Sequence, residues 1–143
     1  MTYQEATNYI FTKLPMYQRI GAAAYKADLS VTQTLMSLMG HPEKNLRCIH
    51  VGGTNGKGSV SSMLASVFQE SGMKTGLYTS PHLTDFRERI RINGKKIHRK
   101  NVIEFIENYQ DIIEKIKPSF FEISVAMAFQ YFQQKQVDIA IIE

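Results

Sequence analysis

The spacing of apolar and polar positions along the chain switches repeatedly between a helical period and a strand-like one. Residues 2–11 and 101–116 have helical spacing, and Asp28 is placed to cap a helix with apolar positions at 31, 35, 38 and 39. Residues 47–51, 76–80 and 137–142 are short apolar runs that predict strands. The last run is nearly continuous, as expected for a strand buried on both faces. Alternating helices and strands predict an α/β fold with a mostly parallel sheet flanked by helices.

Three further segments complete the predicted elements. A helix from Ser59 to about Gly72 has apolar positions at 60, 63, 64, 67 and 68, and another spans 119–134. Residues 88–97 predict a hairpin around an Asn93-Gly94 turn. Asn101 and Glu104 predict a capping box for the helix that follows. In residues 12–28 the pattern is broken by Pro15 and Gly21, and surface positions are expected at Arg19, Tyr25 and Lys26.

Composition narrows the class of protein. The 143 residues suit one domain, and 43% are hydrophobic, enough for a core. No apolar run approaches the roughly 20 residues that span a bilayer, and no signal-peptide pattern begins the chain, so we expect a cytoplasmic protein without a membrane partner. The only cysteine, Cys48, lies in an apolar segment and is expected to be buried. The four histidines lack metal-ligand spacing, although His82 is expected near a site because it follows Ser80 and Pro81.

The net charge of +4 favours anionic partners. Residues 87–100 contain seven Lys or Arg and one acid, Glu88. Because these charges alternate with Ile90 and Ile92, they indicate a solvated strand face, and we expect no nucleic-acid partner. Attraction of a carboxylate substrate is the milder interpretation.

The glycine-rich turn Gly53-Thr54-Asn55-Gly56-Lys57-Gly58-Ser59 lies between a predicted strand and a predicted helix. Glycines allow backbone N–H groups to turn toward phosphate oxygens, and the helix N-terminus attracts the same anion. The pattern departs twice from the usual phosphate-binding loop: it is one residue short before Gly56, and the hydroxyl after Lys57 is displaced to Ser59. The order of strand, glycines, lysine and hydroxyl predicts a nucleotide site, most simply for ATP.

This turn resembles the phosphate loop of the folylpolyglutamate synthase family, including dihydrofolate synthases, in the Mur ligase superfamily. Residues 78–83 and 86–90 resemble a second motif of that family and its continuation, and residues 119–122 resemble a pterin-contacting segment. The resemblance covers the whole chain, but only about the first third of a typical member. It therefore implies the N-terminal part of a Mur-ligase-type ATP-binding domain over residues 1–143. The strand ending at Glu143 agrees, because a buried parallel strand should continue into a further crossover.

The resemblance implies ATP-dependent ligation of L-glutamate to dihydropteroate or a folate through an acyl phosphate. It implies that ATP is held by the seven loop residues, with Lys57 catalytic, and that Mg²⁺ is held by Ser80 and Glu143. The substrate would contact the residues Ser119, Phe120, Phe121 and Glu122. The full-length enzyme is expected to act on small molecules and to be a monomer.

Several alternatives stay open at this stage. Ser119 and Glu122 have capping-box spacing, a structural role that is compatible with substrate contact. Ser80 could simply end a strand, and Glu143 could be a solvated residue. The rival functions are a Mur ligase acting on a muramoyl peptide precursor and a non-catalytic nucleotide-binding domain. The residues do not separate dihydrofolate synthase from folylpolyglutamate synthase activity.

Overall fold

The computed structural model describes residues 1–14 and 28–143. The described chain forms two compact units: a helical unit, Met1–Pro42 with Arg99–Met127, and a sheet unit, Glu43–His98 with Ala128–Glu143. No helix in these described ranges is long and apolar enough to cross a membrane. The positions predicted to break the pattern or line a surface lie outside the described residues: Pro15, Arg19, Gly21, Tyr25 and Lys26.

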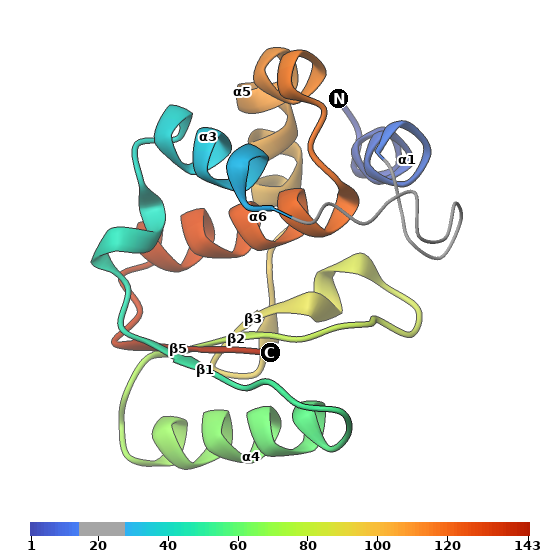
Figure 1. Cartoon of the computed structure of the whole chain (residues 1–143). Helices are drawn as coiled ribbons and strands as arrows, with labels where there is room; N and C mark the ends of the chain where they lie inside the picture. Colours follow the sequence, from blue (N-terminus) through green and yellow to red (C-terminus); the bar gives the residue numbers. More distant parts are fainter. Residues whose placement is uncertain (15–27) are drawn as a thin grey trace. The chain divides into compact units, whose positions relative to one another are not determined.

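The predicted helices and strands occur in the predicted order, and Figure 1 labels most of them. The elements are α1 (Tyr3–Lys13), α3 (Ser30–Leu38), η2 (Pro42–Asn45), β1 (Cys48–His50), α4 (Lys57–Glu70), β2 (Thr75–Tyr78), η3 (Phe86–Arg89), β3 (Ile90–Ile92), β4 (Lys95–Lys96), α5 (Arg99–Ile116), α6 (Phe120–Gln134) and β5 (Ile139–Ile142).

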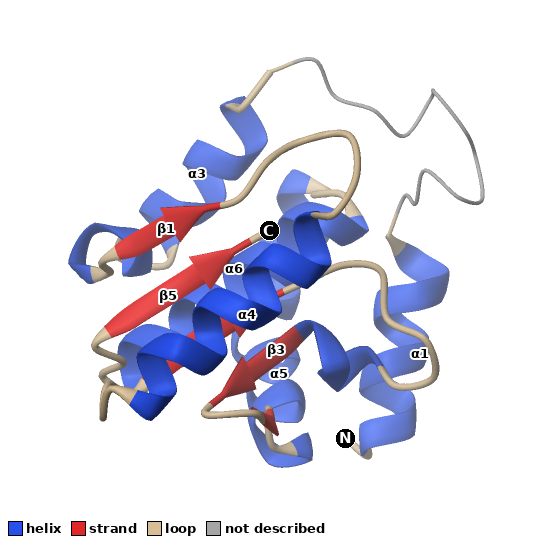
Figure 2. Ribbon diagram, turned by 90° about the horizontal axis from the view of Figure 1, so that it is seen from below, coloured by secondary structure: helices blue, strands red, loops and turns tan. Residues whose placement is uncertain are grey.

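The sheet unit is built on five strands in the order β1-β5-β2-β3-β4. Strand β5 pairs in parallel with β1 and with β2, and Figure 2 shows the arrowheads of β1 and β5 pointing the same way. The predicted hairpin adds β3 and β4 in antiparallel pairing. The predicted α/β class is confirmed, and its parallel part consists of the three strands β1, β5 and β2.

Strand β5 is the buried centre of this unit. Ile139 is 9% exposed, while Ala140 and Ile141 are fully buried, which confirms the prediction of burial on both faces. Burying each isoleucine side chain contributes roughly 1.5–3 kcal/mol. Helix α4 covers one face of the sheet (Figure 1), and Leu64 and Phe68 pack there against the cluster of Leu77, Ile139 and Ile141.

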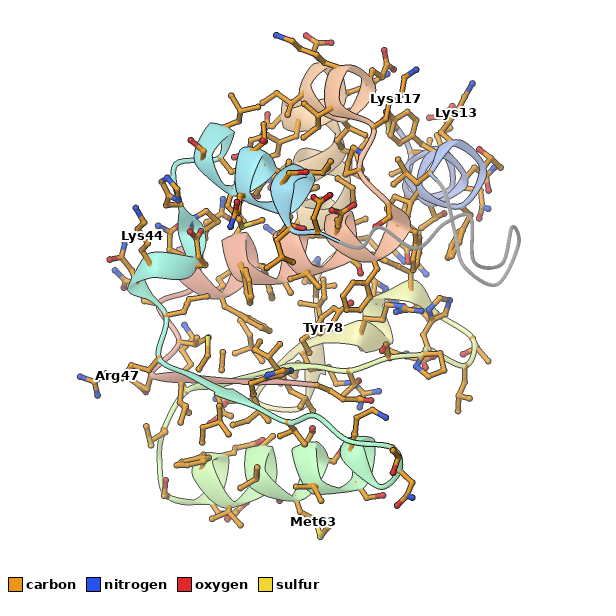
Figure 3. The ribbon with its side chains drawn as sticks, in the orientation of Figure 1. Lys13, Lys44, Arg47, Met63, Tyr78 and Lys117 are labelled. Atoms are coloured by element: carbon orange, nitrogen blue, oxygen red, sulfur yellow. The ribbon has the colours of Figure 1, made fainter. Side chains whose placement is uncertain are left out.

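The predicted apolar stripe of α4 is only half correct. Val60, Met63 and Val67 are 44–66% exposed, and Figure 3 shows Met63 pointing away from the sheet. The face that meets the sheet runs instead through Ser61, Leu64, Ala65 and Phe68, with Ser61 fully buried. Because apolar residues occupy both sides of this helix, periodicity alone could not identify the packed side.

The helical unit contains α1, α3, α5 and the first half of α6. Thr2 and Glu5 form a capping box at the start of α1, and the Phe11 and Phe120 rings stack at 5.5 Å between centroids. Two predicted caps are wrong. Helix α5 begins at Arg99, so Asn101 lies inside it, and the N-cap of α3 is Leu29, although the Asp28 carboxylate accepts a hydrogen bond from the Ser30 N–H at 2.8 Å.

Close packing between β2 and α6 in the sheet unit gives the first prediction. A Cβ added to Gly76 would lie 2.9 Å from Cδ1 of Phe132, a fully buried ring. We expect Gly76→Ala to lower the free energy of unfolding by about 1–3 kcal/mol because the ring must shift. Urea denaturation of residues 1–143 measures this cost.

The control is the double variant Gly76→Ala/Phe132→Leu. It should cost less than the sum of the two single variants, since the shorter side chain removes the clash. Strictly additive costs would contradict the steric explanation.

Candidate phosphate and metal site

The glycine-rich turn connects β1 to α4 and has the backbone that its sequence predicts. Gly53 and Gly56 have φ angles of +149° and +73°, a region that favours glycine. Gly56 is the N-cap of α4, and the helix start receives no hydrogen bond from a capping side chain. The first N–H groups of α4 are therefore oriented toward the turn without a side-chain acceptor, which is the arrangement that binds anions.

Lys57 is the first residue of α4 and folds back over the turn. Its Cγ lies 3.9 Å from the position of a Cβ on Gly53. Among the described residues, the Lys57 ammonium has no hydrogen-bond or ion-pair partner. A cation without a protein partner beside uncapped helix N–H groups is suited to an anionic ligand.

Ser80 and Glu143 meet at the same edge of the sheet. The backbone N–H of Ser80 donates to Oε2 of Glu143 at 3.2 Å, and the backbone N–H of Glu143 donates to the carbonyl of Tyr78 at 3.0 Å. A Cβ on Gly58 would lie 3.7 Å from the same Oε2. The structure thus brings together the glycine-rich turn, Ser80 and Glu143, three segments that are distant in sequence.

The oxygen atoms of this group are hard donors. A hydroxyl and a carboxylate suit Mg²⁺, which in proteins keeps several waters and takes phosphate oxygens alongside one or two carboxylates. The described residues contain no cluster of three or more His, Cys, Asp or Glu that could hold a metal ion by itself. The donor set therefore fits a Mg²⁺ that arrives with a nucleotide better than a metal held by protein ligands alone.

The segment 119–122 belongs to the helical unit, where it caps α6. The Ser119 N–H donates to Glu122 Oε2 at 2.7 Å, and the Glu122 N–H donates to Ser119 Oγ at 3.2 Å. The Thr32 hydroxyl donates to Glu122 Oε1 at 2.9 Å. The capping role of this pair is confirmed. Phe120 is buried, whereas Phe121 is 52% exposed and offers the largest accessible surface of the four residues.

Known proteins match the chain along its whole length. A Bacillus subtilis dihydrofolate synthase/folylpolyglutamate synthase is 36% identical over 99% of the chain and 33% of its own length. The solved folylpolyglutamate synthase of Thermotoga maritima has a TM-score of 0.86 and 39% identity over 99% of this chain and 32% of its own. A solved complex of folylpolyglutamate synthase (FPGS) with AMPPCP and folate has a TM-score of 0.86 and 36% identity. The match covers 100% of this chain and 35% of the solved one. No family model matches the sequence.

The chain belongs to the folylpolyglutamate synthase/dihydrofolate synthase family. It spans about a third of the length of these relatives. The resemblance based on residues 53–59 and 78–83 is confirmed, and so is the Mur ligase fold that it implied.

A short 3₁₀ helix in the segment that follows Ser80 was not predicted from the sequence. Residues 86–89, of which 88 and 89 were predicted as the start of the hairpin, form the 3₁₀ helix η3, which Asp85 and Glu88 cap reciprocally. Arg89 is 5% exposed, and its Nε donates to Nδ1 of His82 at 2.7 Å. Desolvation, with the positive charge of Arg89, lowers the pKa of His82. The spacing of Asp85 and Glu88 is a capping-box signal that could have revealed η3.

The basic segment 87–100 is partly neutralised within the sheet unit. Arg87 pairs with Asp85 at 2.7 Å, and Lys96 lies 3.8 Å from Asp85 and 4.0 Å from Glu88. Together with buried Arg89, these contacts show that the segment is not the uniformly solvated strand face that the alternation predicted. Cys48, expected to be buried, is exposed on β1 at the end of the strand order.

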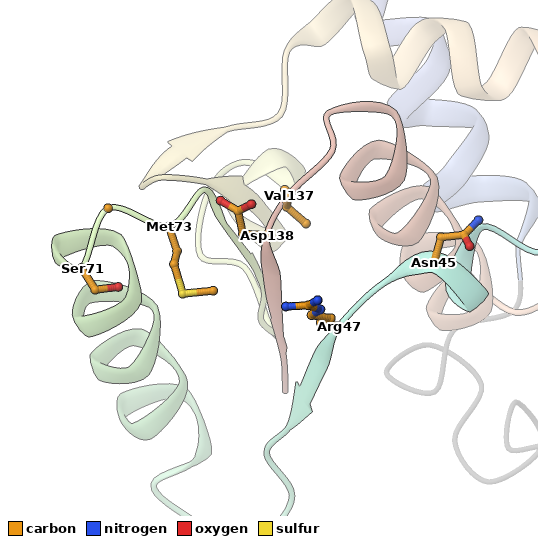
Figure 4. A pocket seen from close by; sticks show the side chains of 7 residues that line it. Asn45, Arg47, Ser71, Met73, Val137 and Asp138 are labelled. Atoms are coloured by element: carbon orange, nitrogen blue, oxygen red, sulfur yellow. The ribbon is translucent and has the colours of Figure 1, made fainter.

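A hollow of about 500 Å³ lies at the amino-terminal ends of β1, β2 and β5, away from the carboxyl ends where Ser80 and Glu143 lie (Figure 4). It is lined by residues that precede β1, β2 and β5, including Arg47, Met73 and Asp138. Ligands of open α/β sheets bind outside the carboxyl ends of the strands, where the turn, Ser80 and Glu143 lie. The hollow is therefore separate from the candidate site.

The carboxylate of Glu88 holds the backbone of residues 83–85, and its titration predicts a stability that depends on pH. It accepts hydrogen bonds from the N–H groups of Leu83, Thr84 and Asp85 and from the Thr84 hydroxyl, which together lower the pKa of Glu88 to about 2. A lowered folded-state pKa means that the stabilisation is complete above about pH 4.5 and is lost as the pH falls toward 2.

We expect Glu88→Gln to be less stable than the parent at pH 7, and the difference to shrink between pH 4.5 and 2. Urea denaturation at several pH values measures it, with the exposed Glu70→Gln as the control. A difference between parent and Glu88→Gln that does not change with pH would contradict this role for the carboxylate.

Proposed function

We propose that the full-length protein ligates L-glutamate to dihydropteroate or a folate at the expense of ATP. The observation that carries the proposal is the meeting of the glycine-rich turn, Ser80 and Glu143 at the carboxyl edge of the parallel strands. The family match supports it, since the relatives are named folylpolyglutamate and dihydrofolate synthases and one was solved with AMPPCP and folate.

The proposed chemistry is activation of a carboxylate. Oxide is a poor leaving group, so the substrate carboxylate first takes the γ-phosphoryl group of ATP, and the acyl phosphate is then attacked by the glutamate amine with release of phosphate. The residues Gly53 to Ser59 would hold the phosphates through their backbone N–H groups. Lys57 would neutralise charge that develops on the transferred phosphoryl group.

Ser80 and Glu143 would hold Mg²⁺ together with the phosphate oxygens. When bound, Mg²⁺ supplies electrostatic stabilisation of the phosphoryl group. The 3.2 Å hydrogen bond from the Ser80 N–H to Oε2 of Glu143 would orient the carboxylate for this role.

The segment 119–122 is proposed to contact the pterin. Both oxygens of Glu122 already accept hydrogen bonds within the helical unit, and Phe120 is buried against Phe11. The exposed ring of Phe121 is therefore the part of this segment best suited to stack on a planar substrate. The monomeric state and the lack of a nucleic-acid partner stay predictions.

The phosphate role of Lys57 is tested in the full-length protein. We expect Lys57→Ala to lower the rate of ADP release, assayed with glutamate plus dihydropteroate or tetrahydrofolate, by roughly 100-fold or more, because one preorganised cation is removed. Lys44→Ala removes the same charge from an exposed position in η2 and is the matched control. Full activity of Lys57→Ala would reject the assignment.

The same assay separates the substrate classes. ADP release stimulated only by a muramoyl peptide precursor would reject the folate assignment. Binding of ATP without turnover of any of these acceptors would favour the non-catalytic nucleotide-binding domain.

Purified 1–143 is expected to show no measurable ligase activity. The chain spans about a third of its relatives, and none of its residues is proposed to hold the glutamate co-substrate. Turnover of dihydropteroate, ATP and glutamate by 1–143 would contradict this expectation.

A further inference from the structure

Arg89 is an almost fully buried cation beside the proposed metal site. It is the last residue of η3 and is 5% exposed. Removing a guanidinium from water is costly unless its donors are satisfied, so a buried arginine indicates specific partners. Two of its contacts are with the chain segment that carries Ser80.

The first contact is made by the main chain. The carbonyl of Arg89 accepts a hydrogen bond from the N–H of Thr79 at 3.0 Å, one residue before Ser80. The second is made by the side chain, whose Nε donates to Nδ1 of His82 at 2.7 Å, two residues after Ser80. One residue thus holds the segment on both sides of the hydroxyl-bearing position.

His82 is itself held in a fixed orientation. An Nδ1 that accepts a hydrogen bond carries no proton, so the neutral ring is protonated on Nε2. The ring also packs edge-on against Phe86, with centroids 6.2 Å apart and planes at 75°. The imidazole therefore connects the segment after Ser80 to η3 through its hydrogen bond with Arg89 and its ring contact with Phe86.

The remaining anchors of the segment do not depend on the Arg89 side chain. The Ser80 N–H donates to Glu143, and the Leu83 N–H donates to Glu88 at 2.9 Å. Replacing the side chain of Arg89 would leave these bonds and the Thr79 bond intact and would remove the connection to His82. This separation makes the contribution of the side chain measurable.

We propose that Arg89 is a positioning residue for the metal site, which holds the Ser80 hydroxyl in place through Thr79 and His82. The inference rests on the proposed function, in which Ser80 and Glu143 bind the Mg²⁺ of ATP. Arg89 touches neither nucleotide nor metal in this account. Its effect reaches the site through the backbone of residues 79–82.

The test uses full-length protein and the binding of a fluorescent, non-hydrolysable ATP analogue at increasing Mg²⁺ concentration. Mutation of a residue that orients a metal ligand typically lowers metal affinity roughly 10- to 100-fold. We expect Arg89→Met and His82→Leu each to raise the half-saturating Mg²⁺ concentration by about 10-fold. Binding of the analogue without Mg²⁺ should not change, because the glycine-rich turn is untouched.

A conservative variant and a charge control sharpen the result. In His82→Asn the side-chain oxygen can replace Nδ1 as acceptor, so the Mg²⁺ dependence should return close to that of the parent. Arg47→Met makes the same substitution at an exposed position on the opposite edge of the sheet and should leave the Mg²⁺ dependence unchanged. His82→Leu keeps the proposal testable if Arg89→Met does not fold.

The outcomes separate this inference from the proposed function. Parent-like Mg²⁺ dependence in Arg89→Met or His82→Leu, combined with a weakened response in Ser80→Ala, would overturn the positioning role alone. Parent-like dependence in Ser80→Ala would overturn the assignment of Ser80 as a metal ligand. Weaker binding of the analogue without Mg²⁺ in the Arg89 and His82 variants would show a general structural effect and would also overturn the positioning role.

Discussion

The parallel pairing of β5 with both β1 and β2 is the constraint on which the candidate site depends. Ile142 lies opposite His50 on one side and Tyr78 on the other, so the three strands end at one edge of the sheet. Whatever follows each strand must then meet there: the glycine-rich turn, Ser80 and Glu143. A slip of one residue in β5 would exchange the faces on which Ile139, Ala140 and Ile141 lie, and side chains of different size would then have to fit into a close-packed interior. The apolar sequence of β5 therefore determines where the charged residue after it lies.

The features that the sequence predicted well carry their signal locally. The glycines of residues 53–58 predict a turn because positive φ angles need them, and the structure has such angles at Gly53 and Gly56. The run at 137–142 predicts a central strand because a continuous apolar segment can be satisfied only by burial on both faces. Asn93 and Gly94, both with positive φ, form the predicted hairpin turn. In each case a few neighbouring residues are sufficient to exclude other conformations.

The features that were missed depend on partners far away in the fold. Nothing near Arg89 in the sequence indicates that it is buried, because its location is decided by η3 and by the segment around His82. Val60 and Met63 satisfy the helical pattern as well as Leu64 does, but only Leu64 lies on the side that meets the sheet. Cys48 is apolar and lies in a strand, yet it is exposed because β1 is the last strand on its side of the described sheet. Periodicity describes the faces of an element, but not which face its neighbours cover.

Under the proposed function, the hydroxyl that reaches the metal comes from outside the phosphate loop. In the common loop, a hydroxyl directly after the lysine reaches the metal. Here that position is Gly58, and a Cβ there would lie 3.7 Å from the Glu143 carboxylate, an ordinary van der Waals contact. Small size at residue 58 is thus not required by Glu143 itself. We propose that Ser80 supplies the hydroxyl instead; it lies two residues after β2, and its backbone N–H donates to the same carboxylate. Under this proposal, metal binding depends on the sheet register, which brings Ser80 and Glu143 together, and on the segment that Arg89 contacts at Thr79 and His82.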